Sequence, residues 1–382
     1  MTSRDPVIVG VAESDLGIVG PDRNELQLQA QAASRALADA GLSLRDVDGL
    51  LTASVDAMPV AMRVAEYLGI TPTYIDSTYL GGASFVTHVG HAALALRAGM
   101  CEVALITYGS TQRSQRSRTF GAQGGVRFED QYEQIWGLPQ PLGAYALAAT
   151  RHQEMYGTTS EQLAEVAVAA RRWAALNPVA FERGPLTIED VLSSPVISSP
   201  LHQRDCCLVT DGGGAIVMTT AERARDLPGA AVRVLGHGEA STHNRITSSP
   251  DLLTVPASIS APRALEMAGV GIDDIDVFEL YDSFTITVLL TLEAIGCCKP
   301  GEGGSFVEGQ RTAPGGEVAL NTSGGGLSYG HPGMFGIFTV IEAVRQLRGS
   351  CGSRQVAGAE LALAHGTGGV MNAGSTVVLG RS

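Results

Sequence analysis

The segment STYLGGASFVTHVGHAALALRAG, residues 77–99, has the layout that places a nucleophile at the first turn of a helix. Polar residues lead through a glycine pair into an amphipathic run, and the free backbone N–H groups at such a helix start stabilise a thiolate or an oxyanion. The residue at the tip of this turn is Gly82, which has no side chain. The segment therefore predicts a site for negative charge that lacks its own nucleophile.

Two tyrosines lie in short polar segments of the second half of the chain. Tyr281 opens the segment YDSF, and Tyr329 lies in the glycine-rich segment NTSGGGLSYGHP. A phenol can donate or accept a proton, but it is not a nucleophile that forms an acyl-enzyme here. The two tyrosines are therefore candidates for proton transfer, and the alternative for each is a core aromatic residue with a satisfied hydroxyl group.

Three neighbours of these tyrosines carry further chemistry. His331 follows Tyr329 in the same segment, where it could bind developing negative charge or only cap a helix beside Pro332. Ser283 could serve as a nucleophile, but no histidine–aspartate pair is evident beside it in the sequence. Asp282 is expected to orient the residues around it.

The remaining candidates for nucleophilic or metal chemistry give weaker signals. The cysteines have no CxxC spacing, so we expect reduced thiols and no zinc site. They are Cys101, Cys206, Cys207, Cys297, Cys298 and Cys351. His88 and His91 lie three residues apart on the helix after the glycine turn, but no third ligand is evident, and a helix surface or interface is the favoured interpretation.

Composition limits the class of protein. The chain has 382 residues, 45% hydrophobic and 17% charged, which is enough to bury a large core. A formal net charge of −13 argues against nucleic acid or an anionic membrane as the main partner. The opening segment MTSRDPVIVGVAES does not resemble a signal peptide, and no apolar run reaches the roughly 18 residues of a spanning helix. We expect a cytoplasmic protein.

An internal repeat organises the elements that must position these residues. The segment at residues 33–51 matches the segment at residues 261–280 at an offset of 228. Each copy predicts a helix, a glycine C-cap, a capped turn and a strand, with an apolar strand before it and a helix and strand after it. Equivalent residues include Ala36 and Ala264, Gly41 and Gly269, and Asp48 and Asp276. The two halves are therefore predicted to be copies of one βαβα-rich unit.

A different stretch separates the copies. Polar loops and one helix fill roughly residues 110–200, and strand character returns in RDCCLVTDGGGAIVM before residue 220. We therefore expect an N-terminal half over residues 1–220, with an inserted loop domain, and a C-terminal half over residues 221–382.

The duplication and four motifs together resemble the thiolase superfamily, specifically its sterol-carrier-protein-type thiolase-like branch. The motifs are AARRWAALNPVAF, DCCLVTDGGGAIVM, NTSGGGLSYGHPGMFG and the C-terminal HGTGG, and the resemblance covers nearly the whole chain. It implies an α/β fold with two similar halves in five layers, α-β-α-β-α. It also implies a loop domain for the coenzyme A moiety.

The resemblance also implies where the catalytic groups would lie. The acylatable cysteine of a thiolase falls on Gly82, and the second, acid–base cysteine falls on the HGTGG segment near His365 or on Ser283 of YDSF. Both cysteines are absent. The tyrosine pair instead resembles that of thiolase-like aldolases that cleave steroid side-chain CoA esters. Gly82, Asp282 and His365 are then expected to contact substrate, and His331 to lie at a helix N-terminus that converges with the Gly82 turn.

Three functions remain open from the sequence. One is retro-aldol cleavage of a β-hydroxyacyl-CoA without a covalent cysteine, the second is a thiolase-type acyltransferase, and the third is a non-catalytic acyl-CoA binder or scaffold. The resemblance implies no cofactor besides the coenzyme A of the substrate. It also implies a homodimer, with a small OB-fold and zinc-ribbon protein as a possible companion.

Arginines of the loop domain are candidates for the coenzyme A phosphates, because the planar guanidinium group matches phosphate geometry. The sequence indicates the region and selects no single arginine. These residues are Arg113, Arg116, Arg118, Arg171 and Arg172.

Overall fold

The computed structural model describes residues 3–54, 60–116, 132–138 and 140–382. Ten strands form one mixed sheet in the order β10-β9-β11-β12-β8-β1-β7-β4-β2-β3. The strands of the first half are β1 (Pro6–Glu13), β2 (Gly49–Thr52), β3 (Tyr74–Asp76), β4 (Val103–Ser110) and β7 (Gly212–Thr220). Those of the second half are β8 (Val232–Ser241), β9 (Val277–Leu280), β10 (Ala319–Leu320), β11 (Leu361–Gly368) and β12 (Ala373–Arg381).

The two halves of the sheet meet at β1 and β8, which are antiparallel and pair over two positions, Val7 with Arg233 and Ile8 with Val232. On both sides of this junction the strand sequence is the same: β1-β7-β4-β2-β3 in one direction and β8-β12-β11-β9-β10 in the other. In each half, the three strands farthest from the junction are parallel to one another. The predicted duplication is therefore visible in the sheet.

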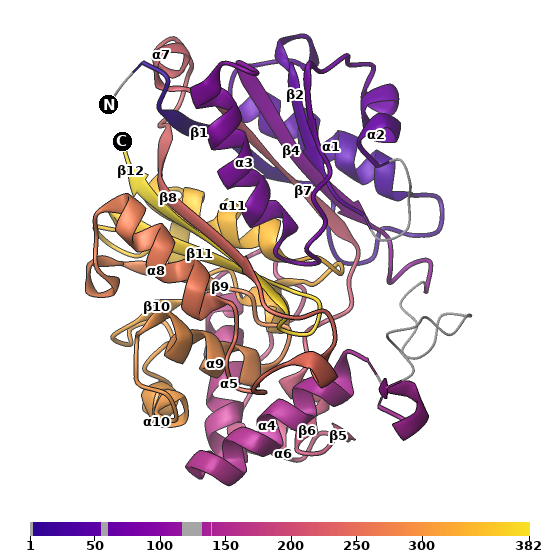
Figure 1. Ribbon diagram of the computed structural model, residues 1–382, viewed down its shortest axis with the longest axis vertical. Helices are drawn as coiled ribbons and strands as arrows, with labels where there is room; N and C mark the ends of the chain where they lie inside the picture. The colour runs from indigo at the N-terminus through magenta and orange to yellow at the C-terminus, as the bar shows by residue number, and fades with distance from the viewer. Residues whose placement is uncertain (1–2, 55–59, 117–131, 139) are drawn as a thin grey trace.

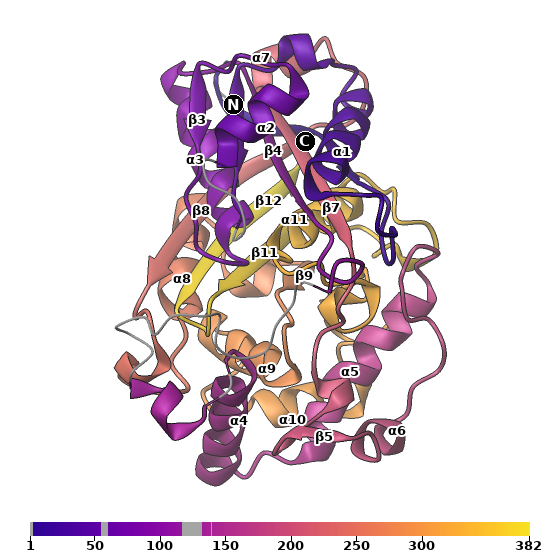
Figure 2. The same ribbon diagram turned by 90° about the vertical axis from the view of Figure 1, so that its right-hand side faces the viewer.

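Helices complete the layers of the fold (Figures 1 and 2). Helices α3 (Ser84–Ala98) and α11 (Gly336–Leu347) pack against strands of both halves. Helix α1 (Glu25–Asp39) covers the outer face of the first half, and α8 (Ala257–Ala268) covers that of the second. Two outer helical layers, two half-sheets and a central pair of helices give the expected α-β-α-β-α order, although β1 and β8 join the half-sheets into one.

The other helices are α2 (Val60–Leu68), α4 (Leu142–Tyr156), α5 (Ser160–Ala175), α6 (Ile188–Leu192), α7 (Ala221–Ala224), α9 (Thr285–Ile295) and α10 (Gly303–Val307). Of these, α2 and α7 pack on strands of the first half, and the rest lie in the loop segment or around the second half. The loop segment gathers at one end of the molecule (Figure 1). The loop segment also carries the small hairpin of β5 (Val196–Ser198) and β6 (Leu201–His202). Among the described helices, none is long and apolar enough to cross a membrane.

The two halves share equivalent side-chain contacts as well as the same strand order. The Asp48 carboxylate accepts the backbone N–H groups at the start of β4, and Asp276, its equivalent, accepts those at the start of β11. A Cβ added at Gly10 would overlap the carbonyl oxygen of Ala36, and one at Gly236 would overlap that of Ala264. Each half therefore fixes its first helix on its first strand by the same close approach.

Alanine at Gly10 should lower the free energy of unfolding by about 1–3 kcal/mol, because overpacking a tight contact typically costs that much. Gly236→Ala should cost a similar amount, since the same carbonyl contact recurs there. Gly184→Ala is the matched control, because no atom lies within 4 Å of the added Cβ. Midpoints of chemical unfolding measure the difference, and equal midpoints for Gly10→Ala and Gly184→Ala would contradict the assignment.

Candidate active site

The ring of Tyr281 fills the space that a side chain at Gly82 would need. A Cβ added at Gly82 would overlap Cε2 of this ring and would lie 2.6 Å from the carbonyl oxygen of Thr367. Both Tyr281 and the Gly82 turn are buried. Glycine at the tip of the turn is therefore the residue that lets a tyrosine stand where a nucleophile would otherwise project.

The hydroxyl group of Tyr281 lies in a small polar cluster. It is 2.9 Å from Nε2 of His331 and 3.1 Å from the carbonyl oxygen of Gly333, to which it can donate. The backbone N–H of Phe335 also bonds to it. Burial holds the pKa of Tyr281 well above its usual value of 10, so the phenol is neutral near pH 7. The sequence prediction that Tyr281 and His331 share one site is reproduced in their geometry.

His331 does not begin a helix, contrary to expectation. Helix α11 starts at Gly336, and His331 lies five residues earlier in an extended loop. The backbone N–H of His331 donates to Oγ1 of Thr210 at 2.9 Å, and its carbonyl oxygen accepts from Nε2 of Gln112 at 2.7 Å. Its ring stacks on Phe335 with centroids 6.0 Å apart. Glycines and Pro332 allow the loop to stay outside the helix, and the Thr210 and Gln112 side chains of the first half hold it there.

The starts of α3 and α11 nevertheless converge. A Cβ added at Gly336, the first residue of α11, would overlap the carbonyl oxygen of Gly82. The first residues of a helix carry backbone N–H groups without intrahelical partners and the positive end of the helix dipole. Two such ends beside Tyr281 can stabilise negative charge on an oxygen placed between them.

Asp282 holds the glycine-rich loop through hydrogen bonds to its backbone. Its buried carboxylate accepts the N–H groups of Gly326 at 2.6 Å and Leu327 at 3.2 Å, at the start of a single π-helical turn over Gly325–Tyr329. Burial raises its pKa to about 7, against the lowering effect of these hydrogen bonds. The expected orienting role of Asp282 fits this geometry, and its contact with substrate stays a prediction.

Tyr329 has a different partner from the one that its sequence position indicates. Its hydroxyl group donates to the Glu13 carboxylate at 2.8 Å, and Arg345 of α11 forms an ion pair with the same carboxylate. Burial and the Glu13 charge raise the pKa of Tyr329 well above 10. The structure thus does not bring the Tyr329 hydroxyl to the Tyr281–His331 cluster, because the buried charge of Glu13 requires a donor.

Ser283 and His365 lie beside Tyr281 in the chain or in the sheet. The Ser283 hydroxyl pairs with Oγ1 of Thr287 at 3.1 Å and bonds to Tyr145, neither of which is a histidine base. Nδ1 of His365 is 2.8 Å from Oγ1 of Thr376, and burial lowers the pKa of this histidine to about 3. Its carbonyl oxygen accepts the N–H of Tyr281. Nucleophilic catalysis by Ser283 and substrate binding by His365 stay predictions without a supporting contact.

The histidines of α3 and the six cysteines supply no metal site among the residues that the structure describes. Nε2 of His88 lies 3.1 Å from the carbonyl oxygen of Thr78, and Nδ1 of His91 lies 2.6 Å from the Asp76 carboxylate. His88 is fully buried, so it does not form the helix surface that the sequence favoured for it.

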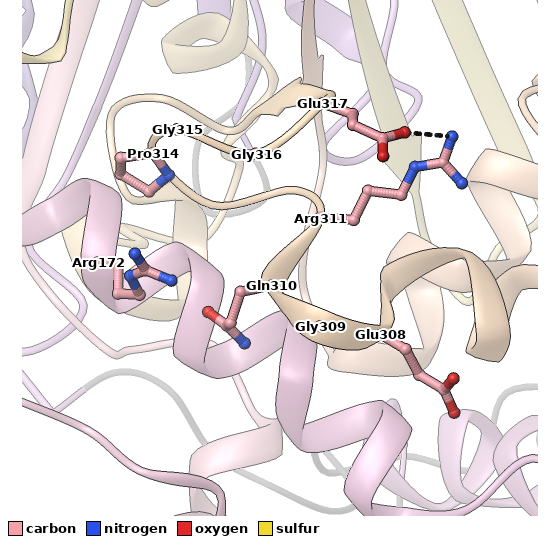
Figure 3. A pocket seen from close by; sticks show the side chains of 9 residues that line it. All are labelled: Arg172, Glu308, Gly309, Gln310, Arg311, Pro314, Gly315, Gly316 and Glu317. Carbon is pink, nitrogen blue, oxygen red and sulfur yellow. Dashed lines mark ion pairs between the residues drawn. The ribbon is translucent and has the colours of Figure 1, made fainter.

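The loop-domain arginines divide into structural and surface residues. The Arg113 guanidinium donates to the carbonyl oxygen of Val209 at 2.8 Å, and Nε of the buried Arg171 donates to Oγ of Ser328 at 2.9 Å. Arg172 lines a pocket of about 460 Å³, shown in Figure 3, together with the loop over residues 308–317. In that pocket Arg311 pairs with Glu317 at 2.9 Å. Arg118 lies outside the described residues.

Tyr145 and Cys207 are site residues that the sequence did not single out as functional. Tyr145, on α4 of the loop segment, bonds to Ser283, and the Cys207 N–H donates to the Ser283 carbonyl oxygen at 2.9 Å. The thiol of Cys207 lies close enough to both Tyr145 and Tyr281 to raise their pKa values. No spacing in the sequence marks these contacts, because they join segments more than 60 residues apart.

Comparisons with known proteins found one family model and several similar relatives. Residues 238–381 match the family model described as "Thiolase C-terminal domain-like". The chain is similar to the 17-hydroxy-3-oxo-4-pregnene-20-carboxyl-CoA lyase of Mycobacterium tuberculosis, with 34% identity over 98% of this chain and 99% of the relative. It is also similar to the acetyl-CoA acetyltransferase of Methanothermobacter thermautotrophicus, with 31% identity over 96% and 97%.

A solved structure shows the same likeness in three dimensions. It is described as "Ltp2-ChsH2(DUF35) aldolase", and it matches with a TM-score of 0.89 and 33% identity over 100% of this chain and 99% of that one.

Gly82→Cys should not create thiolase activity, because the new side chain meets the Tyr281 ring and the Thr367 backbone. It should instead displace Tyr281 and lower stability by about 1–3 kcal/mol or more. CoA-dependent cleavage of a β-ketoacyl-CoA and the unfolding midpoint measure the two effects. Gly82→Ala is the control with similar bulk and no thiol, and thiolase turnover gained by the cysteine variant alone would contradict the steric account.

Proposed function

The chain belongs to the thiolase superfamily, in its sterol-carrier-protein-type branch, and from that premise we propose that it cleaves a β-hydroxyacyl-CoA by a retro-aldol reaction. It is an acyl-CoA carbon–carbon bond enzyme of this superfamily, a lyase or an acyltransferase. One observation carries the choice of lyase: the Tyr281 ring occupies the position above Gly82 that an acylated side chain would need. A retro-aldol cleavage requires no acyl-enzyme.

The proposed chemistry uses the Tyr281–His331 pair as proton acceptor. The β-hydroxyl proton passes to the Tyr281 oxygen while the Tyr281 proton passes to Nε2 of His331, 2.9 Å away. The Cα–Cβ bond then breaks, its electron pair forms the enolate of the thioester, and the β-carbon leaves as a ketone or aldehyde. The enolate finally takes a proton at Cα and becomes a shortened acyl-CoA.

The enolate oxygen would lie at the converging starts of α3 and α11. We assign this oxyanion role to the helix starts rather than to the His331 ring, because Nε2 of that ring faces Tyr281. The coenzyme A portion of the substrate would extend toward the loop segment, and we propose no other cofactor.

An acyltransferase that works without the usual cysteine is the second candidate, and similarity to an acetyl-CoA acetyltransferase supports it. The two reactions differ in their need for free CoA. Panels of β-hydroxyacyl-CoA and β-ketoacyl-CoA substrates, each with and without added CoA, distinguish them. CoA-independent cleavage of a hydroxyacyl substrate supports the lyase, and CoA-dependent cleavage of ketoacyl substrates alone rejects it. The non-catalytic scaffold considered from the sequence is not supported by relatives that are lyases and transferases.

We also propose a homodimer that pairs through the outermost strand of the first half. β3 lies at an end of the sheet. Around it Ile75, Tyr79 and Leu94 are 48%, 50% and 51% exposed, and a dimer through this edge would cover these large apolar side chains. Sedimentation should show a dimer at micromolar concentration, and Ile75→Glu should shift it toward monomer. A wild-type monomer across that range would reject the proposal.

The description of the similar structure names ChsH2(DUF35) beside Ltp2, which supports a companion protein for this chain. Full turnover by the isolated chain would remove the need for one. With no membrane-spanning helix among those described, we propose that the protein acts in the cytoplasm.

Tyr281→Phe should reduce cleavage of the hydroxyacyl substrate by about 10²–10⁴-fold, because it removes an acid–base group and keeps the ring that packs on Gly82. His331→Ala should lose a similar factor, since it removes the proton acceptor behind Tyr281. Tyr329→Phe should mainly reduce stability, by about 1.5–3 kcal/mol for a hydrogen bond to a charged group. Steady-state rates and unfolding midpoints of the three variants test this, and near-full activity of Tyr281→Phe would refute the mechanism.

A further inference from the structure

Four buried tyrosines lie at the glycine-rich loop or beside the YDSF segment, and their hydroxyl groups differ in the hydrogen bonds that hold the proton. Tyr108 donates to the Pro332 carbonyl oxygen at 2.5 Å and accepts the Met334 N–H at 3.1 Å. Tyr329 donates to the charged Glu13. Tyr281 has His331 and Gly333 within 3.1 Å. The fourth, Tyr145, donates to the Gly369 carbonyl oxygen over 3.4 Å, which exceeds the usual length of such a bond.

Two donors lie near the oxygen of Tyr145. The Ser283 hydroxyl group and the backbone N–H of Met371 are close enough to act to lower its pKa. Donors of this kind stabilise the negative charge that remains when a phenol gives up its proton. Burial still raises the pKa of Tyr145, to about 12. Tyr145 is therefore protonated before the reaction and donates over a long hydrogen bond. The two nearby donors would stabilise its phenolate.

Tyr145 also lies against the turn that carries the site. Its ring packs on Phe284 with centroids 4.4 Å apart, at the end of the YDSF segment. Its hydroxyl group reaches the loop between β11 and β12 at Gly369, and a Cβ added at Gly81 would lie 2.8 Å from the N atom of that glycine. Tyr145 is 2% exposed, as deeply buried as Tyr281 at 5%. Tyr281 thus meets the Gly81–Gly82 turn directly at Gly82, and Tyr145 reaches it through Gly369.

We propose that Tyr145 is the proton donor for the carbon of the enolate, a role that rests on the proposed retro-aldol function. The Tyr145 O–H bond breaks, its proton forms the new C–H bond at Cα, and the phenolate stays on Tyr145 beside Ser283 and Met371. His331 then carries the proton taken from the β-hydroxyl group. Transfer of that proton to the Tyr145 phenolate through solvent restores both groups. Tyr281 handles the oxygen-bound proton and Tyr145 the carbon-bound one.

This division of labour is tested by hydrogen exchange at the α-carbon. By microscopic reversibility, the Tyr145 phenolate must remove a Cα proton from a shortened acyl-CoA, so the wild-type chain in D₂O should exchange the α-protons of propionyl-CoA. Mass spectrometry measures the deuterium incorporated. Tyr145→Phe should lose at least about 100-fold of this exchange. Tyr281→Phe should retain most of the exchange while it loses cleavage, because its proton is not the one transferred to carbon.

Two further variants sharpen the result. Ser283→Ala removes one donor to the phenolate and raises the pKa of Tyr145, so exchange at neutral pH should fall about tenfold and its rise with pH should move upward. Tyr156 lies on the same helix and has an exposed ring, so Tyr156→Phe should leave exchange and cleavage unchanged.

The outcomes separate this proposal from the proposed function. Cleavage without exchange in the wild-type chain, or exchange retained by Tyr145→Phe, would overturn the role of Tyr145 and leave the lyase in place. Exchange that depends on Tyr145 in a chain that cleaves no hydroxyacyl substrate would support Tyr145 as the carbon acid–base group and reject the lyase. Equal loss in Tyr145→Phe and Tyr281→Phe would show that one proton path serves both steps, and would also overturn the proposal.

Discussion

The fit of the Tyr281 ring into the space above Gly82 is the constraint on which the site depends. Two atoms cannot approach much closer than van der Waals contact. A side chain at the turn and a phenol from the second half therefore exclude each other. The chain has the phenol. Its ring position then fixes where the hydroxyl group meets His331 and how closely α11 can approach the turn. The proposed retro-aldol chemistry fits this arrangement, because it requires no nucleophile at the turn.

The surrounding polar contacts hold this arrangement rigid. Asp282 fastens the glycine-rich loop through two backbone N–H groups, and Thr210 and Gln112 of the first half fasten His331. Deeper in the second half, the carboxyl group of Glu279 accepts the backbone N–H of Thr322 at 3.0 Å, the Glu342 carboxylate lies 2.8 Å from the hydroxyl group of the same threonine, and Arg354 pairs with Glu342. Burial and the neighbouring Glu342 charge raise the pKa of Glu279 well above its usual value. Satisfied buried groups of this kind specify one loop geometry.

The duplicated halves give the scaffold its symmetry, and the helix starts break it. The same aspartate and glycine contacts build both copies, whereas α3 begins directly at the Gly82 turn and α11 begins five residues after His331. The inserted loop segment adds Tyr145, whose ring packs on Phe284 of the YDSF segment. The proposed site therefore lies where the two copies differ, at the point where their central helices meet.

The sequence by itself determined the duplicated α/β fold and the missing nucleophile, and it selected Tyr281 and His331 as candidates, which the structure places 2.9 Å apart. A repeat offset, a glycine at a turn and the residues of a motif are properties of the chain itself. They can be read without knowing which residues meet in space. It predicted wrongly that His331 opens a helix, since glycines and proline allow either conformation and only contacts from Thr210 and Gln112 decide between them. The sequence also paired Tyr329 with Tyr281. In the structure the Tyr329 hydroxyl group instead donates to Glu13, because a charged carboxylate is the strongest acceptor nearby.

Only the tertiary structure decided those partners. Glu13 lies more than 300 residues from Tyr329, and Tyr145 lies more than 130 residues from Ser283, so no spacing along the chain indicates that they meet. The same holds for the reason that residue 82 is glycine, because the atom that excludes a side chain there belongs to the other half of the protein. Side chains are assigned their chemistry by what surrounds them in space, and that surrounding is set when the two halves pack against each other.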